Sequence, residues 1–196
     1  MNAYTTLESH LNLRANFTKE ETHEFLEAFE MKKLKKRQFI IQPNFVADHR
    51  NYVVDGALRA YIVAEDGSDH TIQFAVKDWW ISDYNSYIYQ KPATMFVIAL
   101  EDSTVLQITC EREKALKASN YAYETFFRQM AERSTAYMQR RIISNLMLDA
   151  ESRYELFLET YPEIASKVPQ YALASFLGMT TEFLSRIRNN RIAKKS

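Results

Sequence analysis

The chain has 196 residues, of which 46% are hydrophobic and 13% aromatic, and its 25 basic and 25 acidic side chains give a formal net charge of zero. This content is enough for one or two domains with a real core, and the three glycines and four prolines argue against disorder. A single cysteine excludes an internal disulfide, a cysteine-rich zinc site and a four-cysteine iron–sulfur cluster. Because there is no apolar leader and no run of transmembrane length, we expect a cytoplasmic protein that does not bind membranes.

The first predicted element is helical and covers residues 5–36. Thr18 followed by Glu20 and Glu21 is typical of a helix start, and apolar side chains at 25, 26 and 29 give the helix one apolar face. The run KKLKKR at 32–37 is interpreted as the basic end of this helix, where cations suit the helix dipole.

Residues 38–110 are expected to form β-structure. Two strand-like runs, at 57–64 and 70–76, flank the sequence EDGSD, which is typical of a hairpin turn. The runs TMFVIAL and STVLQIT follow, separated by Glu101 and Asp102. Many short strands with tight turns favour a barrel or roll over a parallel sheet.

A return to helix is predicted for residues 111–160, with a long helix in the segment from Ser119 to Leu148, which has no glycine or proline. Spacings of four and three define a seam for another helix, made of Tyr123, Phe127, Met130, Ser134, Tyr137 and Arg141. These residues are expected to form the contact between the two chains of a dimer. The alternative is packing onto the chain's own roll, and a helix of this length can do both with different stripes. Asp149 is expected to cap a next short helix that Pro162 terminates.

The segment VPQYALASFLGMTTEFLSRIRNNR (168–191) predicts two helices joined by a short turn. Pro169 suits a first helical turn, Gly178 ends the first helix where a positive φ is cheap, and Thr180 caps the second helix. Leu184 and Ile187 are expected to face back toward the first helix. This pattern is the signature of a DNA-binding helix-turn-helix, and an ordinary helical hairpin is the alternative.

The exposed side of the second helix would then read DNA. Its basic character is local, because residues 182–196 hold five Lys or Arg against Glu182 alone. Arg can donate two bonds to a guanine edge and Glu can accept one from cytosine. The side chains predicted to contact DNA are Thr180, Thr181, Glu182, Ser185, Arg186, Arg188 and Arg191, with Lys194 and Lys195 as further phosphate contacts.

The order of these elements, over essentially the whole chain, resembles the cyclic-AMP receptor / fumarate–nitrate regulator (Crp/Fnr) family. The stretch LGMTTEFLSRIR (177–188) is similar to that family's recognition helix, with Glu182 and Arg186 on its base-reading positions and Thr181 where a basic residue is often found. The resemblance implies an α+β fold: a jelly-roll sensor domain at 1–115 like a cyclic-nucleotide-binding domain, a dimerisation helix at 116–148, and a helix-turn-helix domain at 149–196. It also implies a homodimer on a two-fold symmetric operator, RNA polymerase as a further partner, and an effector that reorients the DNA-binding parts.

The sensor loop departs from the family's pattern. Cyclic-nucleotide binders of the family carry Gly-Glu-Leu and then an Arg-Ser or Arg-Thr pair, where this chain has Ser82-Asp83-Tyr84 and Pro92-Ala93-Thr94. A cyclic phosphate needs a charged donor or close backbone N–H groups. The loop offers neither, and Lys77 and Lys91 are distant substitutes, so cyclic AMP is not the expected effector.

The loop is rich in aromatic residues instead, which suggests a pocket for an apolar or planar effector of unknown identity. The residues assigned to this pocket are Trp79, Trp80, Asp83, Tyr84 and Tyr87. The alternative is that these rings fill the roll and support the long helix. No cofactor and no metal are expected.

Two other classes of function are the alternatives to a transcription regulator. A small-barrel enzyme needs clustered ligands, which the four histidines do not provide, and no glycine-rich phosphate loop or nucleophile elbow occurs, so the chain is not expected to be an enzyme. An effector-binding dimer without DNA binding is the other alternative.

Overall fold

The computed structural model describes residues 3–195, without the side chains of residues 192, 194 and 195. Two short helices, α1 (Ala3–Asn12) and α2 (Lys19–Glu27), come first. The predicted start of α2 is confirmed, because the Thr18 hydroxyl accepts from the N–H of Glu21 and the Glu21 carboxylate accepts from the N–H of Thr18. This reciprocal pair of bonds satisfies two backbone donors that the first turn of a helix leaves free.

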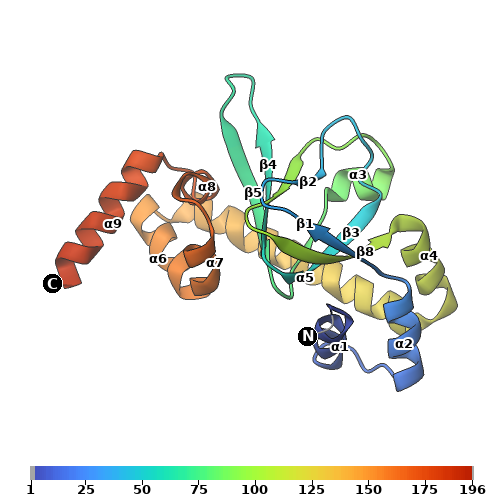
Figure 1. Cartoon of the computed structure of the whole chain (residues 1–196). Coiled ribbons are helices and arrows are strands. Elements are labelled where there is room, and N and C mark those ends of the chain that lie inside the picture. Colours follow the sequence, from blue (N-terminus) through green and yellow to red (C-terminus); the bar gives the residue numbers. More distant parts are fainter. Residues whose placement is uncertain (1–2, 196) are drawn as a thin grey trace.

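Two four-stranded antiparallel sheets follow and form the predicted roll (Figure 1). One sheet has the order β1-β8-β3-β6 and the other β2-β7-β4-β5. The strands are β1 (Glu30–Leu34), β2 (Phe39–Ile41), β3 (His49–Asp55), β4 (Ala57–Val63), β5 (Asp69–Val76), β6 (Trp80–Ile81), β7 (Phe96–Ala99) and β8 (Ser103–Thr109), with helix α3 (Tyr84–Tyr89) after β6. The predicted hairpin is confirmed as β4 and β5, and its turn includes Gly67 at a φ of +83°.

One sequence prediction in this region is wrong. Residues 30–34, assigned to the end of the first helical segment, form strand β1, which pairs with β8 from Glu30↔Gln107 to Leu34↔Ser103. In β1 only Leu34 is buried, so the run lacks the alternation that marks a strand in a sequence. Pairing with a strand about 70 residues away outweighs the local preference for helix.

Two helices lead out of the roll. They are α4 (Cys110–Ser119) and α5 (Tyr121–Met147), separated at Asn120, whose side chain caps α5 by accepting from the N–H of Ala122. The long helix predicted between Ser119 and Leu148 is therefore confirmed. α5 runs behind the sheets in Figure 1, and its first half shares an aromatic core with α1 and α2.

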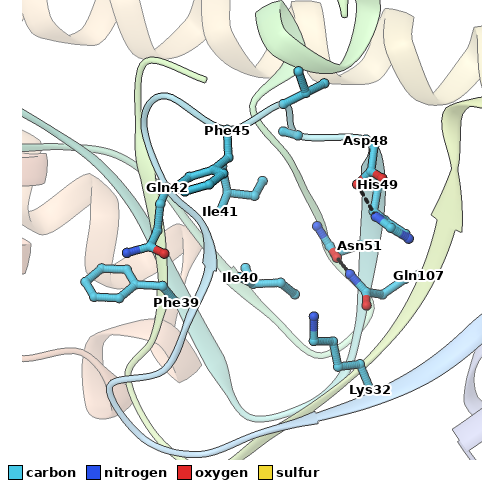
Figure 2. A pocket seen from close by; sticks show the side chains of 12 residues that line it. Lys32, Phe39, Ile40, Ile41, Gln42, Phe45, Asp48, His49, Asn51 and Gln107 are labelled. Carbon is cyan, nitrogen blue, oxygen red and sulfur yellow. Dashed lines mark hydrogen bonds and ion pairs between the residues drawn. The ribbon is translucent and has the colours of Figure 1, made fainter. Parts of the chain in front are cut away.

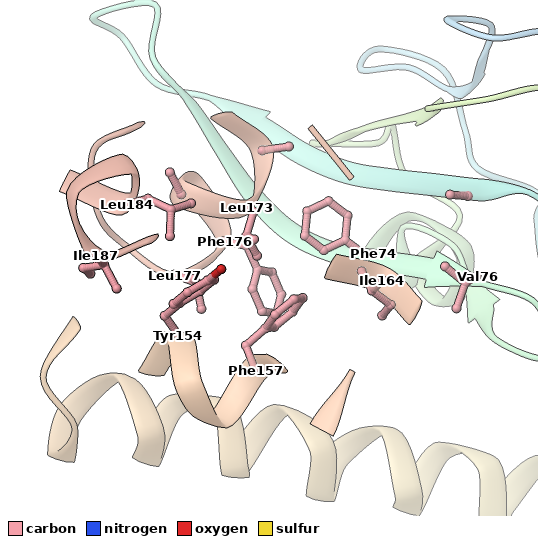
Figure 3. Packing of buried hydrophobic residues seen from close by; sticks show 13 residues of the cluster. Phe74, Val76, Tyr154, Phe157, Ile164, Leu173, Phe176, Leu177, Leu184 and Ile187 are labelled. Carbon is pink, nitrogen blue, oxygen red and sulfur yellow. The ribbon is translucent and has the colours of Figure 1, made fainter. Parts of the chain in front are cut away.

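The chain ends in four helices, α6 (Ala150–Thr160), α7 (Pro162–Lys167), α8 (Gln170–Phe176) and α9 (Thr181–Lys195). Asp149 caps α6 as predicted, accepting from the N–H of Ser152 at 2.8 Å, and Pro162 starts α7 after α6 has ended. The buried residues of these helices form one cluster with Phe74 and Val76 of β5 (Figure 3). The C-terminal helices are thus packed onto the edge strand of the roll. Among residues 3–195 no helix is long and apolar enough to cross a membrane.

Candidate nucleic-acid interface and sensor region

The two helices and the turn predicted at 168–190 are present as α8, residues 177–180 and α9. α8 ends because Gly178 takes a left-handed conformation, with φ at +68°. The N–H of Met179 then bonds back to the carbonyl of Ala174 at 3.0 Å, which satisfies a carbonyl at the helix end. Gly178 therefore has the role that the sequence predicted for it.

Local chemistry also sets the start and the inner face of α9. The hydroxyl of Thr180 accepts from the N–H of Phe183 at 3.2 Å, which confirms Thr180 as the cap. Leu184 and Ile187 are buried in the cluster that also contains Ala174 of α8, as predicted. This packing leaves the opposite side of α9 facing outward.

The outward side carries the side chains predicted to read bases. Glu182, Arg186 and Arg188 are exposed, whereas Thr181 and Ser185 are half-buried. The guanidinium of Arg186 lies 5.2 Å from the ring centroid of Phe183 and makes no ion pair with the described residues. Glu182 and Arg186, four residues apart, therefore lie on one face with one negative and one positive group.

Two of the arginines predicted to contact DNA are engaged within the chain. Arg188 donates to the Gln170 side chain at 3.4 Å, a long bond to the neighbouring helix. Arg191 pairs with Glu155 of α6 at 3.0 Å and is half-buried. The side chains of Lys194 and Lys195 lie outside the described residues.

A clamp at Arg141 of α5 holds α8 against the roll. Its guanidinium donates to the carbonyls of Ile72 and Thr71 in β5 and to the carbonyl of Phe176, the last at 3.2 Å. It also lies 4.1 Å from the ring centroid of Phe176. From the sequence, Arg141 was assigned to the dimer seam, and this role was not predicted. The sequence does contain a signal for this role, because Arg141 is an arginine on a helix stripe that is otherwise rich in apolar residues.

In the loop that was predicted to bind the effector, Asp83 is fully buried, and donors of the chain itself bond to both of its carboxylate oxygens. One carboxylate oxygen accepts from the N–H of Ser86 at 3.0 Å and so caps α3, and the other accepts from the N–H of Thr94 at 2.9 Å. Thr94 belongs to the stretch that replaces the Arg-Ser pair of cyclic-nucleotide binders. An anionic side chain therefore occupies a backbone donor that a phosphate would need.

The predicted aromatic pocket is not open at Tyr84 and Tyr87, because Arg50 of β3 fills it. The Arg50 guanidinium lies 4.9 Å and 5.2 Å from these two ring centroids and 5.3 Å from that of Phe127. Arg50 also bonds to Glu113 at 3.0 Å, and the Tyr87 hydroxyl donates to Glu113 at 2.8 Å. Burial is the main cause of a raised pKa at both tyrosines.

The two tryptophans assigned to the pocket lie in different clusters. The Trp80 ring packs 5.2 Å from Tyr52, in the aromatic core under α5. The Trp79 ring packs 6.0 Å from Tyr137 and 5.5 Å from Tyr161, near the C-terminal helices. The five assigned residues therefore do not line one cavity, which corrects that prediction. The alternative that the rings fill the molecule and support the long helix agrees with these contacts.

The residues assigned to a dimer seam also pack within the chain. Tyr123 and Phe127 are buried and Met130 partly buried against the core of α1 and α2, and Tyr137 packs on Trp79. Their stripe is the one on which α5 rests on its own roll, which agrees with the alternative that the sequence left open. The helix nevertheless has other apolar side chains in solvent, namely Ile142, Ile143, Leu146 and Met147.

A separate cavity of about 280 Å³ opens on the inner side of the roll (Figure 2). The Lys32 side chain points into it beside Gln107, which donates to Asn51 at 2.7 Å. Phe39 and Phe45 form its apolar side, and none of the five residues predicted for the effector lines it. The part of the chain that is described contains no group of three or more His, Cys, Asp or Glu residues placed to hold a metal ion.

Residues 31–120 match the cyclic nucleotide-binding domain family. No curated protein sequence matches the chain. Solved structures with the same fold include FixK2 from Bradyrhizobium japonicum, at 16% identity and a TM-score of 0.75 over 85% of this chain and 86% of that one. The c-di-GMP-responsive global regulator CLP from Xanthomonas campestris aligns at 15% identity and a TM-score of 0.70 over 91% and 93%. A CooA mutant from Carboxydothermus hydrogenoformans aligns at 18% identity and a TM-score of 0.66 over 92% and 81%. These neighbours are Crp/Fnr family regulators and not enzymes, and the chain has their fold.

Proposed function

We propose that this chain, which shares the fold of the Crp/Fnr regulators, is a bacterial DNA-binding transcription regulator that acts as a homodimer on a two-fold symmetric operator. The observation that carries the proposal is the outward face of α9, where Glu182 and Arg186 are exposed one turn apart near the start of the helix. A helix in this position reaches base edges with its N-terminal residues. In this proposal residues 1–115 are the sensor domain, 116–148 the dimerisation helix and 149–196 the DNA-binding domain.

The side chains of α9 can form hydrogen bonds with both guanine and cytosine. Arg186 can donate two hydrogen bonds to O6 and N7 of a guanine, and Glu182 can accept one from N4 of a cytosine. Thr180, Thr181 and Ser185 lie at the start of the helix and would contribute single contacts. Arg188 and Arg191 would contact phosphates. For this contact Arg191 would leave its ion pair with Glu155 and pair with a DNA phosphate.

A second stripe of α5 supplies the proposed dimer contact. Residues at successive spacings of four, three, four and four fall on one helix face, about a third of a turn from the stripe that rests on the roll. They are Ala131, Thr135, Met138, Ile142 and Leu146. Ile142 is 58% and Leu146 79% exposed, so a single chain leaves this apolar face in water. Pairing two such helices would bury it.

The effector in this proposal acts through the roll and is not cyclic AMP. Asp83 already accepts the N–H of Thr94, and a second negative charge beside it would be repelled and left without donors. The cavity next to Lys32 and Gln107 is the space in the roll that an effector could enter (Figure 2). For an activator, RNA polymerase would be the further partner.

The test is selection of bound fragments from the source genome, followed by gel shift at several salt concentrations. We expect retained fragments to share an inverted repeat and the affinity to fall steeply with salt, because phosphate contacts release counterions. Replacing Arg186 by alanine should lower affinity by about 10- to 100-fold. The matched control is Lys114→Ala, an exposed charge on α4 at the other end of the molecule.

Two outcomes would overturn the proposal. One is the absence of any retained fragment at low salt together with an unchanged Arg186→Ala variant, which would favour an effector-binding protein without DNA binding. The other is an affinity that does not depend on salt.

A further inference from the structure

A second cavity lies at the junction between the long helix and the C-terminal helices. It has a volume of about 220 Å³ and is lined by residues of α5, α6 and α8. Aromatic side chains form its walls, including Phe157 of α6 and Phe176 of α8, whose ring centroids are 5.5 Å apart and which point toward each other in Figure 3. Tyr137 of α5 and Tyr161 also line the cavity, and their ring centroids are 6.3 Å apart.

The charge around this cavity is of one sign. Arg140, Arg141 and Arg153 line it, and the described lining residues include no carboxylate. Arg153 donates to the carbonyls of Leu177 at 2.9 Å and Leu148 at 2.7 Å. Arg141 is held by carbonyls in the same way. Neutral carbonyls fix these two side chains in place without cancelling their charges.

Donors remain free at the same place. The Nε of Arg141 is buried and has no hydrogen-bond partner in the described chain, which is an unusual state for a buried donor. Arg140 is exposed and forms no ion pair with the described residues. An unpaired cation, next to two arginines held by carbonyls and an aromatic wall, is the arrangement that a ligand with one anionic end and one flat apolar end would satisfy.

We infer that this cavity binds a small aromatic carboxylate. The ring would lie against Phe157, Phe176 and the two tyrosines, and the carboxylate would accept from Arg140, next to the positive charge of Arg141. The volume is below the range of about 300–1,000 Å³ that holds drug-sized molecules, so the ligand has a single ring and a short side chain. A dicarboxylate or a sugar phosphate would leave polar groups against the aromatic wall.

The position of the cavity gives the ligand a regulatory consequence, which rests on the proposed function. Its walls belong to α5 on one side and to α6 and α8 on the other. A ligand between these walls would alter the position of α8 relative to the long helix α5. Because α9 packs on α8, its position would change as well. Binding itself does not depend on that role and is measured without DNA.

The first experiment uses 3-phenylpropionate and its neutral counterpart 3-phenyl-1-propanol as probes of the full-length chain in isothermal titration calorimetry. The acid should bind about tenfold or more tightly than the alcohol, because only the acid forms charge-assisted bonds. Trp79 contacts Tyr137 and Tyr161, so binding should change the tryptophan fluorescence. That change should disappear in Trp79→Phe while the heat of binding remains.

Two variants locate the site. Arg140→Gln removes an exposed charge and should abolish the preference for the acid, and Ser144→Phe should block the cavity and abolish binding of both probes. The control is Arg133→Gln, an exposed arginine of the same helix that does not line the cavity. Equal binding of acid and alcohol, unchanged binding in both variants, or no binding of either probe would overturn the inference. A failed gel shift would overturn the regulator proposal and leave the calorimetric result unaffected.

Discussion

Ser175 of α8 and Thr71 of β5 are 104 positions apart in the chain and joined by a hydrogen bond of 2.8 Å, in which the serine hydroxyl accepts from the threonine N–H. The same hydroxyl donates to the carbonyl of Asp69 at 2.8 Å. β5 is an edge strand, and its outward backbone groups would otherwise face solvent or another chain. One small side chain therefore joins the C-terminal helices to the free edge of the roll.

Ser175→Ala should lower the free energy of unfolding by about 1–3 kcal/mol, because it leaves the Thr71 N–H without a partner at a partly buried contact. Urea denaturation measures the change. Ser166→Ala is the matched control, since its hydroxyl bonds only within its own exposed helix and should have an effect within about 0.5 kcal/mol. Equal effects in the two variants would show that the Ser175 bond does not stabilise the contact.

Replacing both Ile142 and Leu146 by glutamate should convert a dimer into a monomer. Two exposed apolar side chains become charged, and like charges would face each other across the two-fold axis. Sedimentation velocity reads the change, and the unfolding free energy of the isolated chain should stay nearly constant. A wild-type protein that sediments as a monomer at all concentrations would contradict the proposed face.

Tyr123→Ala is the companion variant on the other stripe of α5. It removes a ring that is fully buried against Phe25 and Phe17, so we expect a loss of about 3–5 kcal/mol in stability. A change in assembly without a loss of stability would show that this stripe faces another chain.

Glu113→Gln should destabilise the protein by about 3–5 kcal/mol, because it removes the charge that pairs with Arg50 in a buried site. Both side chains are about 95% buried, and Nη1 of Arg50 already has no hydrogen-bond partner among the described residues. Thermal and urea unfolding measure the loss. The exposed pair of Arg128 and Glu132 gives the control, and Glu132→Gln should change stability by less than about 1 kcal/mol.

His10 should make stability depend on pH between about 6.5 and 4. Burial, followed by the charge of Arg14, lowers its pKa to about 4, so the folded chain binds fewer protons than the unfolded chain in this interval. The contribution of His10 to the free energy of unfolding is present above pH 6.5. It is lost as the pH falls, by up to about 3 kcal/mol. Urea unfolding at pH 7 and pH 4.5 measures it.

The matched control for His10 is His23, whose side chain is 77% exposed. His10→Gln should flatten the pH dependence of unfolding between pH 6.5 and 4, whereas His23→Gln should leave its slope unchanged. Parallel curves for the wild type and His10→Gln would refute the assignment.

The sequence was sufficient where structure depends on neighbours a few positions away. The caps at Thr18, Asp149 and Thr180 and the turn at Gly178 were all predicted, because each satisfies backbone groups within its own helix end. The inner face of α9 was predicted for the same reason, since a helix brings positions three and four apart to one side.

The predictions that failed concern partners far away in the chain. Glu30–Leu34 looks helical by itself and is a strand only because β8 offers a free edge. The apolar seam of α5 was correctly found, but whether it faces the roll or another chain depends on where α1 and α2 lie. The aromatic loop indicated a pocket, yet Arg50, more than 30 positions earlier, fills it.

The caps at Thr18, Asp149 and Thr180, the turn at Gly178 and the outward residues of α9 were thus determined by the sequence itself. The tertiary structure alone decided that Ser175 and Arg141 fasten α8 to β5, and that Asp83 and Arg50 occupy the region predicted to bind an effector. The physical reason is the range of the interactions. Caps and turns are local and carry a residue-type signature, whereas a buried arginine or carboxylate is placed by whichever distant groups can satisfy its charge.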